Sequence, residues 1–483
     1  MVFLVDGYDD VFSDMLDSER ARLLEGINRV LEDMIGRGTG FLRRVASGRY
    51  IAVVEERQLE QFANRGYDVL DKIRALDPSV SLSMSIGIGR GARTLREAQD
   101  MAEHALDMAQ GRGGDQAAEM TLDGFTFYGG VSHGVEKRSK VRSRLVADQL
   151  VKLIKEADHV VIMGHRMSDL DAIGAAEGVL RICKICDVPA VIAVRRDATL
   201  AASLIDALCK AGQKDDFIDP KDALPIISKR TLCIVVDTYQ AGLVESKDIL
   251  EKCGKVAVID HHRKGVGYIE NPALVCHEPY SSSASELVTE LLQYVGERDD
   301  KPNRVEAEGL LAGILLDTQD FTLHTGVRTF EAAAALRRYG AETERVRRLF
   351  DVTMVEYNAK ADLVEKAQMY KNCAISIGGE VAPEARVAIA QAANDLLRIQ
   401  GVDASFVAVQ VGNGVNVSAR SMGAVNVQVI MESLGGGGHQ TMAAAQLKHI
   451  TPQAARSRIQ DAIDQYYLSQ KKTTPEARPA KGE

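Results

Sequence analysis

Aspartate and histidine residues recur directly after apolar segments in the middle of this sequence. They are His165, Asp169 and Asp171 in HRMSDLD after HVVIMG, Asp237 at the end of TLCIVVD, Asp260, His261 and His262 at the end of KVAVIDHH, and Asp317 after LLAGILL. Carboxylates packed together repel one another, so such a cluster is costly unless cations neutralise it. Imidazoles mixed with carboxylates suit manganese, iron(II), zinc or magnesium. The residue types therefore predict a metal site, and they suffice for two ions that share a bridging hydroxide.

Each of these residues also has a simpler interpretation. A single aspartate at the end of a strand is usually a turn or helix-cap residue, and a single histidine is usually structural. Three apolar segments that all end in such residues argue against coincidence, because charged groups rarely gather at buried edges.

A second candidate site lies near the C-terminus, in GGGGHQTMAAA. Its residues are Gly435, Gly436, Gly437, Gly438 and His439, together with Arg420 and Ser421 at the end of the preceding strand. We expect the glycines to open a helix whose backbone N–H groups bind phosphate oxygens. A glycine-rich run alone is equally typical of a flexible turn, and this one matches neither an NTPase P-loop nor a dinucleotide-binding fingerprint.

The elements that must position the aspartates and histidines are repeats of strand, loop and helix. Strands are predicted to end at Gly164, Val194, Asp237 and Asp260. In doubly wound parallel sheets, ligands bind beyond the carboxyl ends of the strands. The predicted metal ligands would all be delivered to that one edge.

The whole chain is predicted to be an α/β protein of about three domains. We expect an α/β domain over residues 1–128, a linker over 129–145, a doubly wound parallel-sheet domain over 146–330, connecting helices over 331–370, a smaller α/β domain over 371–470 and a disordered tail over 471–483. Within the first domain, one helix is predicted from about residue 58 to residue 76.

The composition of the chain limits its expected binding partners and its expected cellular compartment. The 483 residues carry a formal net charge of −9 and seven scattered cysteines. An acidic chain does not coat nucleic acid, so no long nucleic acid is expected as a partner. An odd number of cysteines fits a reducing compartment, and no apolar run reaches the ~18–20 residues that span a bilayer. We therefore expect a cytoplasmic protein.

Taken in order, the motifs HRMSDLD, VVDT, VIDHH, LLD and GGGGH resemble those of the DHH/DHHA1 phosphoesterases. In the first domain, VFLVD, SLSMSIGIG and AEHALDMAQGRGGD resemble a degenerate GGDEF domain. Nearly the whole chain is thus similar to the cytoplasmic part of the GdpP-type cyclic-di-AMP phosphodiesterases. The resemblance implies a manganese enzyme, usually dimeric, in which a two-metal-activated hydroxide hydrolyses cyclic di-AMP to linear 5′-pApA.

The resemblance also implies a role for each motif residue. The implied metal ligands are His165 and Asp169 on one ion, Asp171, His261 and Asp317 on the other, and Asp237 as the bridge between them. His262 would face the scissile phosphate as an electrostatic or proton-donating partner, and Asp260 would orient its neighbours. The implied contacts to the non-reacting phosphate and the nucleotide are Arg420, Ser421, Gly435 to Gly438 and His439.

The chain departs from the resembled families in two ways. Where an active diguanylate cyclase has GGDEF, residues 46–50 read ASGRY, although Asp6 still matches another metal-binding acid. Cyclase activity is therefore not expected, whereas weak nucleotide binding or ATP hydrolysis would agree with the resemblance. Members of the GdpP-type family normally begin with membrane helices and a PAS domain. We therefore expect a longer parent protein, anchored at the inner face of the cell membrane.

Two other functions stay open from the sequence. One is a nanoRNase or linear-dinucleotide phosphatase of the same superfamily, because the same metal site serves both reactions. The degenerate first domain favours the cyclic substrate, but the residues that select adenine over guanine are not identified. The other is a catalytically inactive nucleotide-sensing scaffold, which is disfavoured because every expected ligand is present.

Overall fold

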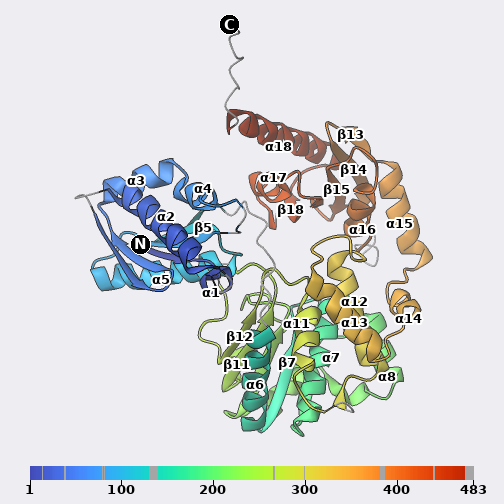
Figure 1. The fold of residues 1–483 in the computed structure, drawn as a ribbon. Helices are drawn as coiled ribbons and strands as arrows, with labels where there is room; N and C mark the ends of the chain where they lie inside the picture. Colours follow the sequence, from blue (N-terminus) through green and yellow to red (C-terminus); the bar gives the residue numbers. More distant parts are fainter. Residues whose placement is uncertain are drawn as a thin grey trace. The chain divides into compact units, whose positions relative to one another are not determined.

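The computed structural model describes residues 1–12, 15–36, 40–78, 80, 82–129, 140–264, 267–297, 300–380, 387–438 and 441–473. Within it the chain divides into two compact units, Met1–Phe350 and Asp351–Glu483. Figure 1 shows the elements of both units in the order of the chain, from blue to red. Every helix of the described residues is too short or too polar to cross a membrane.

The first sheet mixes parallel and antiparallel strands in the order β2-β3-β1-β4-β5-β6. Its strands are β1 (Val2–Val5), β2 (Phe41–Ala46), β3 (Arg49–Val53), β4 (Met84–Gly89), β5 (Gln116–Thr121) and β6 (Gly124–Gly129). The accompanying helices are α1 (Tyr8–Phe12), α2 (Asp17–Ile35), α3 (Glu56–Asn64), α4 (Val69–Arg74) and α5 (Leu95–Gly111). Helix α2 buries Leu23, Ile27 and Leu31, which are four residues apart and so lie on one face that packs into this core.

The single helix predicted over residues 58–76 is wrong, because the chain breaks between α3 and α4. Gly66 and Tyr67 both have positive φ angles, 62° and 54°, which a helix does not accommodate. The ring of Tyr67 is only 1% exposed and lies 4.9 Å from the ring of Tyr128. Packing of this aromatic side chain thus holds the break in place.

The second sheet consists of parallel strands in the order β12-β11-β10-β7-β8-β9. Its strands are β7 (His159–Met163), β8 (Ala190–Ala193), β9 (Phe217–Ile218), β10 (Thr231–Val236), β11 (Lys255–Asp260) and β12 (Leu274–His277). The chain runs outward from β7 to β9, returns to the other side of β7, and runs outward again to β12. This doubly wound order confirms the predicted fold class, and its switch point lies between β7 and β10.

Helices cover both faces of this parallel sheet, which explains why its strands are apolar without alternation. All residues of β10 are buried. One face packs against α7 (Leu170–Ile185) and α11 (Ala284–Leu292), while α12 (Arg304–Thr318) packs against α7 (Figure 1). The other face packs against α10 (Lys247–Lys252). The remaining α-helices of this part are α6 (Lys140–Glu156), α8 (Ala202–Lys210), α9 (Pro220–Ala223), α13 (Val327–Arg338) and α14 (Thr343–Arg348).

The second unit contains a third sheet, in the order β13-β14-β15-β16-β18-β17. Its strands are β13 (Gln368–Tyr370), β14 (Cys373–Glu380), β15 (Ala404–Val411), β16 (Gly414–Ser421), β17 (Gly437–Gly438) and β18 (Met442–Lys448). Its helices are α15 (Met354–Glu365), α16 (Val387–Leu396), α17 (Val427–Ser433) and α18 (Pro452–Thr473).

The glycine-rich segment opens a strand, so the helix expected after it is wrong. Gly437 and Gly438 form β17, which pairs with β18 through Ala444 and Ala443. Exposed and buried residues alternate strictly along β18, and this packing overrides the helix propensity of its alanines. A Cβ atom on Gly436 would lie 2.2 Å from the carbonyl oxygen of Ala444, and one on Gly438 would lie 2.4 Å from Cα of Ala443. The glycines therefore permit close approach of two backbones.

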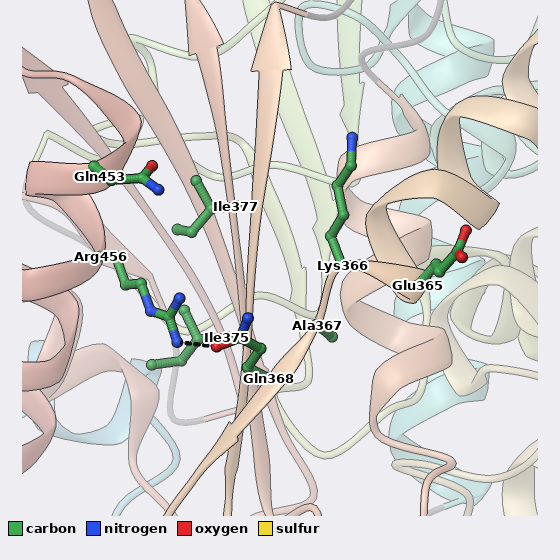
Figure 2. Close-up of a pocket in the computed structure, with 8 residues that line it drawn as sticks. All are labelled: Glu365, Lys366, Ala367, Gln368, Ile375, Ile377, Gln453 and Arg456. Carbon is green, nitrogen blue, oxygen red and sulfur yellow. Dashed lines mark hydrogen bonds between the residues drawn. The ribbon is translucent and has the colours of Figure 1, made fainter.

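The second unit also contains a hollow of about 290 Å³ between the start of α18 and strand β14 (Figure 2). Ile375 and Ile377 line it from β14, and Arg456 of α18 donates a hydrogen bond to the side chain of Gln368. None of the residues lining this hollow is a predicted site residue, so we place no part of the site there.

Candidate metal centre

The carboxyl ends of β7, β10 and β11 carry the aspartates and histidines of the predicted site. His165 and Asp169 lie in the loop between β7 and α7, Asp237 follows β10 directly, and His261 follows β11. Because these strands are neighbours in the sheet, their ends meet at the switch point. Asp317 joins them from the last turn of α12.

The side chains gather into three overlapping groups. In each group the potential ligand atoms all lie within 4.8 Å of one another: His165, Asp169 and Asp237; Asp171, Asp237, His261 and Asp317; Asp237, His261 and His262. Asp237 belongs to all three, so it is the centre of the arrangement.

The backbone at Asp237 adopts an unusual conformation that directs its carboxylate into the cluster. Its φ angle is +57°, in the left-handed region that aspartate tolerates better than most residues. Its Oδ2 lies 3.5 Å from Nε2 of His165, and its Oδ1 lies 3.4 Å from Nε2 of His261. The side chain is 3% exposed. One buried carboxylate therefore lies between two imidazoles from neighbouring strands.

The ring of His165 is held in the tautomer that a metal ligand requires. Its Nδ1 lies 2.8 Å from the carbonyl oxygen of Arg166, and because a carbonyl only accepts, Nδ1 carries the proton. In the neutral ring, the lone pair of Nε2 then points toward Asp237 and toward Oδ1 of Asp169, 3.8 Å away. A nitrogen lone pair and carboxylate oxygens repel one another, so a proton or a cation between them would stabilise this arrangement.

Three carboxylates surround Nε2 of His261. The nearest oxygens are Oδ2 of Asp317 at 3.0 Å, Oδ1 of Asp237 at 3.4 Å and Oδ2 of Asp171 at 3.9 Å. The three acids come from α12, from the loop after β10 and from the start of α7. Elements far apart in sequence thus converge on one point.

Asp171 is fixed by backbone groups that the sequence analysis did not identify. The backbone N–H of Ala284 donates to its Oδ2 at 2.7 Å, and that of Ser285 donates to its Oδ1 at 2.8 Å. Both donors belong to the first turn of α11, where N–H groups lack helical partners. The detectable signal was the segment SSSASE, in which Ser283 caps α11 by accepting from Glu286 N.

The electrostatics of the cluster require added positive charge. Burial raises the pKa of Asp171, and the charges of Asp237 and Asp317 raise it further. Burial would lower the pKa of His165, but the neighbouring carboxylates of Asp169 and Asp237 raise it to about 11. Burial likewise opposes the charged form of His261, yet the neighbouring carboxylates of Asp237 and Asp317 raise its pKa well above the ordinary value. In the absence of metal, protons on the histidines would supply the positive charge.

Unpartnered polar atoms show that the cluster fits metal ions. Oδ1 of Asp237 and Nε2 of His261 are buried and make no hydrogen bond among the described residues. Leaving such atoms without partners is costly, whereas coordination of a cation satisfies them. Carboxylate and imidazole ligands at this density form a site for divalent metal.

Asp260 and His262 form a pair beside the cluster. The backbone N–H of His262 donates to Oδ1 of Asp260 at 3.2 Å, and Nδ1 of its ring donates to the same oxygen at 2.9 Å. The Asp260 side chain is fully buried, whereas that of His262 is 43% exposed. The buried acid therefore orients the more exposed imidazole.

The residues predicted to contact substrate belong to the second unit. Arg420 is the penultimate residue of β16 and donates from Nη1 to Ser418 Oγ at 3.1 Å and to the Ala419 carbonyl at 2.9 Å. Its Nε is buried without a hydrogen-bond partner among the described residues. Ser421 Oγ accepts from Gly423 N at 3.0 Å. Gly435 to Gly438 lie between α17 and β18, and His439 lies outside the described residues.

In the first domain, Asp6 is engaged in hydrogen bonds at the end of β1. Ser83 Oγ and the backbone N–H of Asp115 donate to its Oδ2, at 2.8 and 3.0 Å, and Ser85 Oγ donates to its Oδ1 at 2.6 Å. Arg49, which stands where a cyclase has an acid, pairs with Glu103. The acid retained from the cyclase pattern thus fixes the surrounding loops.

Comparison with known proteins assigns a family to each part of the chain. Residues 3–123 match the GGDEF domain of GdpP-like cyclic-di-AMP phosphodiesterases, residues 159–314 match the N-terminal domain of the DHH family, and residues 382–468 match the DHHA1 domain. These matches confirm the resemblance inferred from the motifs.

Two curated relatives match almost the entire chain. The cyclic-di-AMP phosphodiesterase GdpP of Geobacillus thermodenitrificans is 42% identical over 474 residues, which cover 96% of this chain and 72% of that protein. GdpP of Bacillus subtilis is 40% identical over 478 residues, with the same coverage. A solved exopolyphosphatase-related protein from Bacteroides fragilis shares the fold, with a TM-score of 0.58 and 19% identity over 68% of this chain and 98% of its own.

Proposed function

Because the chain belongs to the GdpP-type family of cyclic-di-AMP phosphodiesterases, we propose that it hydrolyses cyclic di-AMP to linear 5′-pApA. The observation that carries the proposal is the position of Asp237, which is shared by all three groups of potential ligands. A shared carboxylate is the feature needed to hold two cations close together. The buried, unpartnered atoms of this cluster support the same conclusion.

We assign two divalent ions, most favourably Mn²⁺, to the cluster. The ligands of the first ion would be His165, Asp169 and Asp237, and those of the second would be Asp171, Asp237, His261 and Asp317. When bound, such ions activate water as a nucleophile and neutralise charge that develops on the phosphate. Asp169 has a second task, because its Oδ1 accepts from the backbone N–H groups of Asp171 and Ala172 at the start of α7.

We assign the protonation of the leaving group to His262. As the P–O3′ bond breaks, the departing ribose oxygen needs a proton, and His262 is placed to donate it. Asp260 holds the His262 ring through Nδ1, and we assign the proton transfer to the other ring nitrogen, Nε2. General acids of this kind accelerate such steps by about 10²–10⁴-fold.

We assign the binding of the non-reacting phosphate and nucleotide to the second unit. Arg420 supports this role, because its Nη1 donates to Ser418 and Ala419 while its buried Nε makes no hydrogen bond among the described residues. Burial lowers the pKa of Arg420, and a bound phosphate would offset that cost. Ser421, Gly435 to Gly438 and His439 are assigned to the same surface from the family resemblance.

The function is tested by incubating the purified chain and Mn²⁺ with cyclic di-AMP, cyclic di-GMP and linear pApA, and separating the products by chromatography. We expect conversion of cyclic di-AMP to pApA as the fastest reaction, with complete loss on addition of chelator. Faster cleavage of pApA than of cyclic di-AMP would contradict the proposal.

A linear-dinucleotide activity is the second candidate, and one observation favours it. A bifunctional oligoribonuclease and PAP phosphatase, NrnA of Thermus thermophilus, is 27% identical over 341 residues, 68% of this chain. This similarity is lower than that to the GdpP proteins and does not extend over the whole chain. We therefore rank linear substrates second.

We also propose that the chain forms a homodimer and that its parent protein works at the inner face of the cell membrane. Both proposals rest on the family resemblance. Size-exclusion chromatography with light scattering would test the first, and a monomer across micromolar concentrations would contradict it. Membrane fractionation of cells expressing the parent protein would test the second, and recovery in the soluble fraction would contradict it.

A further inference from the structure

A histidine outside the sequence motifs contacts the backbone of the candidate proton donor. His277 is the last residue of β12 and pairs in register with Asp260, the last residue of the neighbouring strand β11. Its Nε2 lies 2.6 Å from the carbonyl oxygen of His262. Because that oxygen only accepts, His277 donates from Nε2.

The His262 peptide is consequently held from several directions. Its N–H and its ring Nδ1 both donate to Oδ1 of Asp260, and its carbonyl accepts from His277. With the backbone N–H and C=O of His262 both bound, a backbone rotation at this residue that would move the imidazole away from the cluster breaks at least one hydrogen bond. Asp260 fixes the ring, and His277 fixes the backbone that bears it.

The position of His277 is itself determined by the loop that carries Asp237. The ring of Tyr239, two residues after Asp237, packs 5.5 Å from the ring of His277 and is 5% exposed. The carbonyl of Tyr239 accepts from Ile269 N at 2.9 Å, which anchors this loop. His277 therefore contacts the loops after both β10 and β11.

We propose that His277 is a positioning residue that aims His262 at the departing 3′-oxygen during cleavage. In that step the oxygen of water bonds to phosphorus, the P–O3′ bond breaks with its electron pair on O3′, and His262 gives O3′ a proton while the proton of the attacking water passes to solvent. This inference rests on the proposed function. The proposed role of His277 is separate from metal binding, because His277 contacts the His262 carbonyl.

The chain offers a matched set of substitutions. In His277→Gln the amide nitrogen reaches the place of Nε2 and can still donate to the His262 carbonyl, whereas in His277→Asn the shorter side chain cannot. His277→Leu removes the donor but keeps an apolar body against Tyr239. We expect His277→Gln to retain kcat within about 3-fold, and the other two variants to lose about 10- to 100-fold in kcat with little change in KM.

The deciding experiment compares two leaving groups. Cyclic di-AMP releases a ribose alkoxide, which needs a proton, whereas the p-nitrophenyl ester of AMP releases p-nitrophenolate, which does not. We expect His277→Asn to lose activity on cyclic di-AMP but to remain near wild type on the p-nitrophenyl ester. Equal losses on both substrates would overturn the proposal, because His277 would then act on the fold or on metal placement.

Two further measurements separate the remaining explanations. Calorimetric titration of His277→Asn with Mn²⁺ should give the wild-type affinity, and a tenfold weaker affinity would overturn the proposal. In a His262→Gln background, His277→Asn should cause no further loss on cyclic di-AMP, and an additive loss would overturn it. If the wild-type protein with Mn²⁺ cleaves neither substrate, it is the proposed function that fails.

Discussion

Oδ1 of Asp237 lies 3.4 Å from Nε2 of His261, and both atoms are buried without a hydrogen-bond partner among the described residues. Two polar atoms this close, each lacking a well-formed hydrogen bond, are costly in a folded protein. A cation that binds both atoms removes the cost. The pair also links neighbouring strands, since Asp237 follows β10 and His261 follows β11.

Asp237→Asn is expected to abolish hydrolysis while leaving the fold intact. Asparagine tolerates the left-handed backbone at this position, where φ is +57°, so the loop should keep its conformation. The lost charge removes the ligand shared by the two ions, and we expect kcat/KM to fall at least ~10³-fold. Steady-state kinetics and a thermal melt check this, and activity within tenfold of wild type would reject the bridging role.

Metal removal should lower stability as well as activity. The carboxylates of Asp171, Asp237 and Asp317 face one another, so ions that bind the native state stabilise it against unfolding. Mn²⁺ at about 100 times its dissociation constant should add roughly 2.7 kcal/mol for one site. We expect chelator to lower the melting temperature of the wild type but not that of Asp237→Asn. Equal shifts in both proteins would show that the metal binds elsewhere.

Glu177→Gln should change how stability depends on pH. Glu177 is fully buried in α7, and both its carboxylate oxygens lack a hydrogen-bond partner among the described residues. Burial, followed by the charge of Glu306, raises its pKa from 4.5 to about 8, and the other charged groups that face it are Asp216, Lys184 and Arg181.

The sign of this effect follows from the raised pKa. Below pH 4.5 both folded and unfolded states hold the proton, and as pH rises to about 8 the unfolded state loses its proton first, so stability falls. The loss is up to roughly 5 kcal/mol at high pH. Melting between pH 5.5 and 8.5 should therefore vary less in Glu177→Gln than in the wild type. Glu251→Gln, an exposed change on α10, serves as the control, and parallel pH curves for Glu177→Gln and wild type would contradict the assignment.

Arg420→Lys is expected to weaken substrate binding without affecting the metal ions. Lysine keeps the charge but cannot reproduce the planar guanidinium, which donates to Ser418 and Ala419 and would, under the proposed function, also bind the substrate phosphate. We expect KM for cyclic di-AMP to rise about tenfold, with kcat and Mn²⁺ affinity little changed. The exposed Arg458→Lys on α18 is the matched control. An unchanged KM would remove Arg420 from the binding surface.

The gathering of the aspartates and histidines at one edge of the sheet could be predicted, because the sequence pattern that indicates it is local. Strands β7, β10 and β11 each end in, or are followed within two residues by, an acid or a histidine, and parallel strands deliver their carboxyl ends to one edge. Asp237, at the end of β10, is the clearest case, since its position in the sequence already implied its position in the sheet.

The features that sequence did not reveal depend on contacts between distant residues. The hydrogen bonds from Ala284 and Ser285 to Asp171 span more than one hundred positions. The segment SSSASE indicates a helix start, but no local pattern shows that this start lies against Asp171. The conformation after Gly438 was misjudged for a similar reason, because pairing with neighbouring strands overrides the helix propensity of the following alanines. His277 escaped notice because its contact with the His262 carbonyl involves backbone that carries no sequence signature.

The most direct test of the account is a crystal structure of the chain soaked in Mn²⁺, with anomalous diffraction measured at the manganese edge. We expect two peaks about 3.5–4 Å apart at the carboxyl ends of β7, β10 and β11, with Asp237 within bonding distance of both. A single peak, or two peaks of which only one contacts Asp237, would contradict the two-ion centre.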